Sequence, residues 1–127
     1  MRYLLDTHAL IWFFEKNPLL SSNAESIIID KNNMVYVSIV SLWEIAIKMS
    51  LGKLSLSLTT DKLFERIEAE DFILTALSSE HIRILQTLPL HHRDPFDRML
   101  IAQAEAESCT IITQYKFFPL YQSPIMW

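Results

Sequence analysis

Short apolar runs alternate along the chain with longer segments whose apolar residues recur every three or four positions. The short runs are rich in β-branched and aromatic side chains, which favour β-strands. They predict strands at residues 3–5, 34–37, 71–74 and 110–113, with a last edge strand at 125–126. The longer segments follow the period of the α-helix. They predict helices at residues 8–15, 22–29, 39–51, 59–68, 79–88 and 95–107.

Several residues mark the ends of these predicted helices. Ser22 and Glu25 have the spacing of a capping box, and Pro95 is a typical first-turn residue. Gly52 stands where a glycine ends a helix. In the segment before it, the helical period predicts a core-facing stripe made of Ile39, Leu42, Trp43, Ala46, Ile47 and Ser50.

The alternation of strands and helices predicts an α/β fold with a mainly parallel sheet. Right-handed connections between parallel strands place helices on both faces of the sheet, so three layers are expected. The 127 residues suffice for one hydrophobic core, and neither a linker nor a repeat interrupts them. We therefore expect a single domain over residues 1–127.

Composition removes several classes of function. Hydrophobic residues make up 50% of the chain and charged residues 20%, which excludes a disordered protein. The single cysteine, Cys109, excludes a disulfide framework and a zinc site built on cysteines. The single glycine, Gly52, excludes glycine-rich phosphate-binding loops. A net charge of −4 argues against a basic nucleic-acid-binding patch, but an enzyme that contacts phosphates through metal ions stays open.

The N-terminal apolar stretch lacks the features of a targeting segment. Asp6 and His8 interrupt it, so it has no signal-peptide core. No uncharged apolar run is long enough to span a bilayer. We therefore expect a cytoplasmic protein without a membrane partner.

Carboxylates fall at positions that a parallel sheet would bring together. Asp6 follows the first predicted strand, and Glu44 lies in the first turns of the helix after the second strand. Asp94 and Asp97 open the last long helix. In such sheets ligands bind beyond the carboxyl ends of the strands, and clustered carboxylates are tolerated when a hard cation lies among them. The pattern favours a Mg²⁺ or Mn²⁺ site that binds phosphate oxygens and polarises a water.

Each carboxylate also has a purely structural interpretation. Asp6 could cap the helix that follows it. Glu44 completes a capping pattern that begins at Ser41, and it could instead pair with Lys48 one turn later. The two aspartates that open the last helix match a further capping pattern.

The remaining polar and aromatic candidates are less specific. Four histidines lack the spacing of zinc ligands, namely His8, His81, His91 and His92. We interpret them as surface groups or as groups that support the metal ligands without binding the metal. The core is the expected place of Trp12, Trp43 and Phe96. A nucleophilic serine or cysteine enzyme is disfavoured, because the chain has no Gly-x-Ser-x-Gly element and Cys109 falls in a predicted buried turn.

Three segments resemble the motifs of a known family. Residues 4–12 read LLDTHALIW, and residues 37–48 read VSIVSLWEIAIK with GKL following at 52–54. Residues 92–104 read HRDPFDRMLIAQA. In this order, and over nearly the whole chain, they resemble PIN-domain proteins. Within that family the set is similar to the VapC-type ribonuclease toxins of prokaryotic type II toxin–antitoxin pairs.

The resemblance implies both a fold and an activity. It implies a PIN-like three-layer fold and metal-dependent endonucleolytic cleavage of RNA by an activated water. The family carboxylates correspond to Asp6, Glu44 and Asp97, which would hold one or two Mg²⁺ or Mn²⁺ ions. Asp94 matches a further acid of this subgroup that acts as a ligand or as a cap. The resemblance also implies a homodimer and a small protein antitoxin that blocks the site.

One position departs from the family pattern. The family often has an acid two residues after the threonine that ends the fourth strand, and here Tyr115 follows Thr113 at that distance. A phenol that stays protonated is a poor ligand for Mg²⁺. An alternative function is therefore a catalytically weak or inactive PIN-like module that acts through partner binding.

A phosphoacceptor signalling domain is a further alternative, and it is disfavoured. Such a domain needs a pair of acids after the first strand and an aspartate after a central strand. Here Asp6 has no acidic neighbour, and no aspartate ends the strand at 34–37.

The chain itself also favours self-association. Its charged fraction is low for a domain of this size. Apolar positions that look exposed follow one another at Trp12, Phe13 and Phe14. Burial of such a patch against a second copy is common among small domains, so a homodimer is expected.

Overall fold

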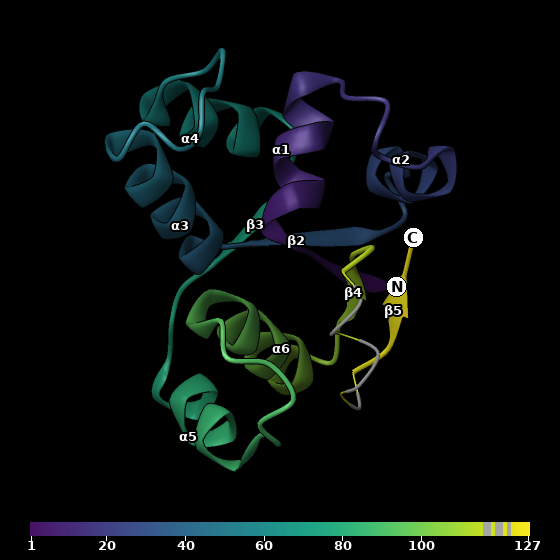
Figure 1. Cartoon of the computed structure of the whole chain (residues 1–127). Coiled ribbons are helices and arrows are strands. Elements are labelled where there is room, and N and C mark those ends of the chain that lie inside the picture. Colours follow the sequence, from purple (N-terminus) through teal and green to yellow (C-terminus); the bar gives the residue numbers. More distant parts are fainter. Residues whose placement is uncertain (116–117, 119–120, 122) are drawn as a thin grey trace.

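The computed structural model describes residues 1–115, 118, 121 and 123–127 of the chain. Its strands are β1 (Arg2–Leu5), β2 (Met34–Ser38), β3 (Ile73–Thr75), β4 (Thr110–Ile112) and β5 (Ile125–Met126). They form one sheet in the order β3-β2-β1-β4-β5, in which all neighbouring strands are parallel (Figure 1). The predicted parallel sheet is confirmed.

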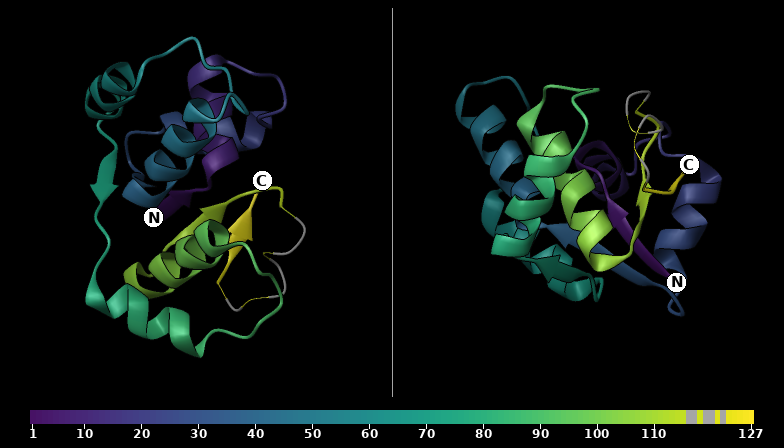
Figure 2. Two further views of the ribbon diagram at one scale, coloured as in Figure 1. Left: turned by 60° about the vertical axis from the view of Figure 1, so that its left-hand side comes forward. Right: turned by 90° about the horizontal axis from the view of Figure 1, so that it is seen from below.

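Helices cover both faces of this sheet. They are α1 (Thr7–Glu15), α2 (Ser22–Ile29), α3 (Ile39–Ser50), α4 (Thr60–Ala69), α5 (Ser79–Thr87) and α6 (Pro95–Glu107). The first four lie on one side of the sheet and α5 and α6 on the other (Figures 1 and 2). The three-layer arrangement expected from the sequence is therefore confirmed. None of the helices that the structure describes combines the length and the apolar character needed to cross a membrane.

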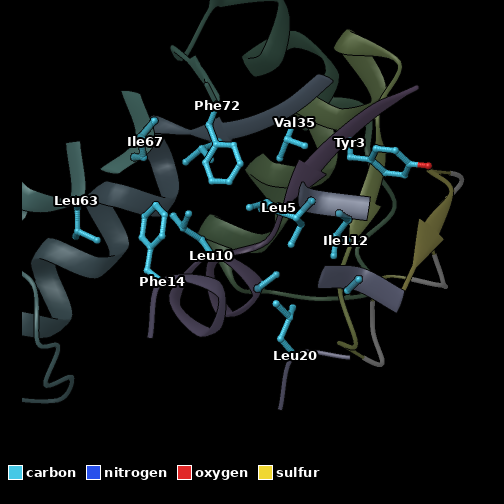
Figure 3. Packing of buried hydrophobic residues seen from close by; sticks show 14 of the residues in the cluster. Tyr3, Leu5, Leu10, Phe14, Leu20, Val35, Leu63, Ile67, Phe72 and Ile112 are labelled. Atoms are coloured by element: carbon cyan, nitrogen blue, oxygen red, sulfur yellow. The ribbon is translucent and has the colours of Figure 1, made fainter. Parts of the chain in front are cut away.

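Every residue of β1 and β2 except the first is buried, as expected for strands covered on both faces of a parallel sheet. Tyr3 and Leu5 of β1 belong to the larger core cluster, to which α1, α2, α3 and α4 also contribute side chains (Figure 3). Leu4 between them belongs to a second cluster with Leu100 and Ile101 of α6. This alternation of side chains along the strand fixes which helices lie on which side.

The structure corrects the predicted core face of α3. Trp43 is 60% exposed, and its ring meets the ring of Phe96 edge-on, with 5.1 Å between the centroids. Ala46 is exposed as well, whereas Ser41 and Glu44 are buried. The helical period failed here because polar side chains occupy the buried face of α3, so hydrophobicity does not report which face is inside.

The helix ends agree with the prediction in part. Ser21, not Ser22, caps α2 and accepts a hydrogen bond from the backbone N of Ala24, so the predicted capping box does not form. The prediction for Gly52 is confirmed. Its φ is +69°, its N–H donates to the carbonyl of Met49 at 3.1 Å, and the next N–H donates to the carbonyl of Lys48 at 2.8 Å. This is the Schellman arrangement, which favours glycine.

Two further interpretations need correction. Phe14 is only 5% exposed and belongs to the core, so it cannot form part of an exposed apolar patch. His81 is 1% exposed rather than superficial. Its Nδ1 accepts a hydrogen bond from the backbone N of Ser78, which completes the cap of α5, and its Nε2 lies 3.2 Å from Glu107 Oε1 on α6.

Candidate functional site

Asp6 follows β1 directly and caps the N-terminus of α1 at the carboxyl edge of the sheet. Its Oδ1 accepts a hydrogen bond from the backbone N of Ala9 at 2.7 Å, and its Oδ2 accepts one from Thr113 Oγ1 at 2.5 Å. Burial raises the pKa of the Asp6 carboxyl, and the two hydrogen bonds oppose this rise. The side chain is thus a true cap, and it also stands at the edge where parallel sheets bind ligands.

Glu44 is a buried carboxylate that links α1 to α3. It is 5% exposed. Thr7 Oγ1 donates to its Oε1 at 2.8 Å and lies 3.1 Å from Ser41 Oγ, while Lys48 Nζ donates to its Oε2 at 2.7 Å. The predicted pairing with Lys48 is confirmed, whereas the capping pattern from Ser41 is wrong because Ser38 caps α3. The hydrogen bond from Lys48 to Glu44 raises the pKa of the ammonium group, so Lys48 stays charged.

The N-terminus of α6 carries the second pair of acids. Asp94 Oδ1 accepts hydrogen bonds from the backbone N of Phe96 at 2.8 Å and of Asp97 at 3.1 Å, which confirms it as the N-cap, with Pro95 in the first turn. Asp97 Oδ2 lies 2.9 Å from Nε2 of His92. Burial raises the pKa of Asp97 to about 6, and the neighbouring Asp94 adds to the rise.

Arg98 fastens the loop that carries His92. Its Nη1 donates to the carbonyl of Pro89 at 2.9 Å and to Tyr121 Oη at 3.3 Å. The same guanidinium reaches, at 3.4–3.5 Å, the carbonyl oxygens of Leu85, Leu88 and His92. Tyr121 Oη in turn accepts from the backbone N of His92 at 3.0 Å. The position of the imidazole is therefore set by side chains rather than by regular backbone pairing.

One group of side chains has the geometry to hold a metal ion. One ligand atom from each of His92, Asp94 and Asp97 lies within 4.8 Å of the other two, and no other such group occurs among the residues that the structure describes. Carboxylate oxygens and an imidazole nitrogen are a donor set that suits a divalent ion such as Mn²⁺. Asp6 and Glu44 lie outside this group.

The two buried acids nevertheless act on the group through their charges. The charge of Glu44 raises the pKa of both Asp6 and Asp97, so all three carboxyls share one electrostatic environment. A charge-compensating cation would relieve this repulsion. That Asp6, Glu44 and Asp97 share a metal ion stays a prediction.

Tyr115 lies beside Asp6, at the position where the family often has an acid. Its backbone N donates to Thr113 Oγ1 at 2.9 Å, and the same hydroxyl holds Asp6. The ring lies 5.4 Å from the ring of His92, centroid to centroid. Together with Asp6, Tyr115 lines a cavity of about 300 Å³. Partial burial and the nearby Asp97 and Asp94 charges raise the pKa of its phenol, which therefore stays neutral.

Sequence reasoning missed three contributors to this site. The spacing of His92 does not mark it as a metal ligand, and only the fold of its loop brings it to Asp97. Thr7 and Thr113, which hold Glu44 and Asp6, are not among the predicted site residues. A signal for Thr113 was present, because a threonine that ends a buried strand shares its sheet edge with the acid that follows β1.

The family model described as PIN domain matches residues 3–116, and the chain belongs to the PIN domain family. A comparison with curated proteins finds no significant match to the sequence.

Solved structures of similar fold extend over nearly the whole chain. VapBC2 from Rickettsia felis, solved with a DNA fragment from its promoter, has a TM-score of 0.75 at 19% identity and covers 100% of this chain and 99% of its own. VapBC-1 from nontypeable Haemophilus influenzae has a TM-score of 0.64 at 18% identity and covers 99% and 97%. FitAcB from Neisseria gonorrhoeae has a TM-score of 0.62 at 18% identity and covers 98% and 96%. At these identities the likeness establishes the PIN fold.

Proposed function

We propose that this PIN domain is a metal-dependent endoribonuclease and the toxin component of a type II toxin–antitoxin pair. The observation that carries the proposal is the grouping of His92, Asp94 and Asp97 within 4.8 Å at the sheet edge occupied by Asp6 and Glu44. Membership of the PIN family, whose members are generally nucleases, supports the activity. The fold shared with toxin–antitoxin complexes supports a protein antitoxin as partner.

The donor set decides which ion the site would hold. Asp97, Asp94 and His92 would bind it, and Asp6 and Glu44 are proposed as further carboxylate ligands. The imidazole favours Mn²⁺, whereas Mg²⁺ prefers oxygen ligands alone. When bound, such an ion lowers the pKa of a coordinated water and neutralises phosphate oxygens.

The protein side chains prepare the site for that ion and for RNA. Thr113 and the first turn of α1 hold Asp6 in one orientation. Thr7 does the same for Glu44. The Lys48 ammonium, 2.7 Å from Glu44, offsets part of the negative charge that would otherwise repel a phosphodiester.

A second candidate function is a catalytically weak module that acts through its partner. The position of Tyr115 favours it, because a neutral phenol lines the cavity beside Asp6 where the family often has an acid. Fewer anionic ligands mean weaker cation binding. The two candidates differ in the rate of RNA cleavage.

The direct test is cleavage of single-stranded RNA by the purified chain with Mn²⁺ or Mg²⁺. We expect internal cuts that EDTA abolishes and that Asp97→Asn reduces at least 100-fold, because it removes a proposed ligand. Asp61→Asn, an exposed acid on α4, is the matched control and should leave the rate unchanged. Absence of metal-stimulated cleavage would favour the second candidate.

The toxin role and the assembly have their own tests. Expression in bacterial cells should arrest growth, and Asp6→Asn should prevent the arrest. Co-expression of a small protein encoded beside the gene should restore growth. A cytoplasmic homodimer is part of the proposal, and light scattering that reports a monomer at micromolar concentration would contradict the dimer.

A further inference from the structure

A cavity of about 300 Å³ opens beside Asp6. It lies where the first turns of α1 face the segment that follows β4. Its lining consists of Asp6, His8, Trp12, Gln114 and Tyr115. The volume is at the lower end for small-molecule sites, which suits one planar group rather than a large ligand.

The aromatic walls of the cavity are fixed by their own packing. Trp12 meets Trp127 edge-on with 5.7 Å between ring centroids, and the ring of His8 lies 5.5 Å from that of Trp12. Tyr115, which also lines the cavity, packs against His92 at 5.4 Å and edge-on against Phe118 at 5.8 Å. Aromatic rings that are already ordered lose little entropy when a flat ligand stacks on them.

The polar groups of the cavity can bind an amide-like edge. Both oxygens of Asp6 already accept hydrogen bonds, so the carboxylate is partly satisfied by the protein. His8 and Gln114 are exposed, so their side chains are accessible to a bound group. The Gln114 amide supplies both a donor and an acceptor, as reading of a base edge requires.

We propose that this cavity is a nucleobase subsite, which holds one unpaired base of an RNA strand next to the acidic cluster. The inference rests on the proposed nuclease function and deepens it. A base between Trp12 and Tyr115 places its own backbone beside Asp6. In this arrangement Tyr115 replaces a metal ligand of the family by a stacking surface, and Gln114 selects among bases.

Binding of short single-stranded oligoribonucleotides tests the subsite without cleavage. Fluorescence anisotropy is measured in EDTA and again with Ca²⁺, with oligonucleotides that differ at a single base. Tyr115→Ala should weaken binding about ten-fold, within the range for loss of one stacked base, and Tyr115→Phe should retain it. Phe64→Ala, an exposed aromatic residue on α4, is the matched control and should change nothing.

Gln114 tests the selection among bases. Gln114→Ala should reduce the difference in affinity between the best and the worst base about ten-fold while binding of the worst is unchanged. Gln86→Ala, an exposed amide on α5, is the control. In addition, quenching of tryptophan fluorescence by the bound oligonucleotide should decrease in Trp12→Phe.

The outcomes separate the subsite from the nuclease activity. If the chain cleaves RNA but Tyr115→Ala leaves affinity, KM and base preference unchanged, the subsite is wrong and the activity stands. If the chain does not cleave, a Tyr115-dependent affinity still supports the subsite as a binding site. If no oligonucleotide binds in EDTA or Ca²⁺, the proposal is overturned. Binding of acetyl-arginine amide instead would assign the cavity to a basic side chain of a protein partner.

Discussion

The two halves of the candidate site are built differently. Asp6 and Glu44 are each 5% exposed, and every one of their carboxylate oxygens already accepts a hydrogen bond from the chain. Asp97 and His92 are less buried, with side chains 18% and 13% exposed, and they contact each other on an irregular loop and a helix end. The first half belongs to the core as much as to the site. The second half depends on a loop and is more open to a ligand.

Because of this difference, different substitutions are needed to test the two halves of the site. In the buried half, substitution of an acid can remove a metal ligand or a group that stabilises the fold. Loss of a ligand lowers metal-dependent cleavage, whereas loss of a structural group lowers stability. In the half formed by the loop and α6, a change mainly alters what the site binds. Matched substitutions can separate these roles.

The largest contrast is expected between two substitutions of Asp6. Asp6→Asn keeps a side chain that caps α1, so it should abolish metal-dependent cleavage while the melting temperature changes little. Asp6→Ala removes the cap and leaves the Thr113 hydroxyl proton without its acceptor, so it should also lower the free energy of unfolding by about 2 kcal/mol. Thermal and urea denaturation check this. An equal loss of stability in both variants would make Asp6 a structural residue first.

Tyr115→Asp should tighten Mn²⁺ binding about ten-fold, because it restores an anionic ligand next to Asp6. The cleavage rate should rise with the affinity if the backbone keeps the family geometry. Calorimetric titration of Mn²⁺ into the unsubstituted protein and the variant measures the two affinities. Equal affinities would mean that position 115 does not face the metal.

Lys48→Met should have opposite effects on stability and on metal binding. The ammonium offsets the charge of Glu44 in the apo protein, so its removal should destabilise the fold by about 1 kcal/mol. The same ammonium repels a divalent ion, so its removal should raise Mn²⁺ affinity about three-fold. Lys62→Met breaks an exposed pair with Glu65 on α4 and should change neither quantity.

The smallest effect on the site itself is expected from Cys109, which is buried on the α6 side of the sheet, away from the carboxylates of the candidate site. Burial raises the pKa of its thiol to about 11. Between about pH 9 and 11 the unfolded chain would lose this proton first, so stability should fall as the pH rises, by about 1–2 kcal/mol in all. Cys109→Ala should remove this part of the pH dependence. Rapid labelling of the native thiol at pH 8 would contradict the burial.

The fold was predictable because its strands and helices have clear periods. β1, β2 and β4 are short apolar runs, and α6 begins at Pro95 as expected. The exposed Trp43 and the buried Ser41 and Glu44 were not predictable from hydrophobicity. Ser41 and Glu44 are buried because they face Thr7 of α1, and this contact is a property of the assembled fold.

The candidate site was predictable in part for the same reason. Asp6 follows a strand and Asp94 precedes a proline, and these are local signals. The contact of His92 with Asp97 depends on the path of an irregular loop. No pattern in the sequence of that loop specifies the path, because Arg98 holds it through carbonyl oxygens that every residue has.

The dependence of this loop on the Arg98 guanidinium has a consequence for inactivation by heat. The loop from Leu88 to Asp94 has no strand or helix of its own, so its order depends on Arg98 and on the Tyr121 hydroxyl. Segments with few backbone pairs open locally at lower free energy than a core sheet does. His92 would then leave Asp97 while the five strands remain intact. The protein would lose its metal-binding geometry at a temperature at which it is still folded, and it would recover that geometry on cooling.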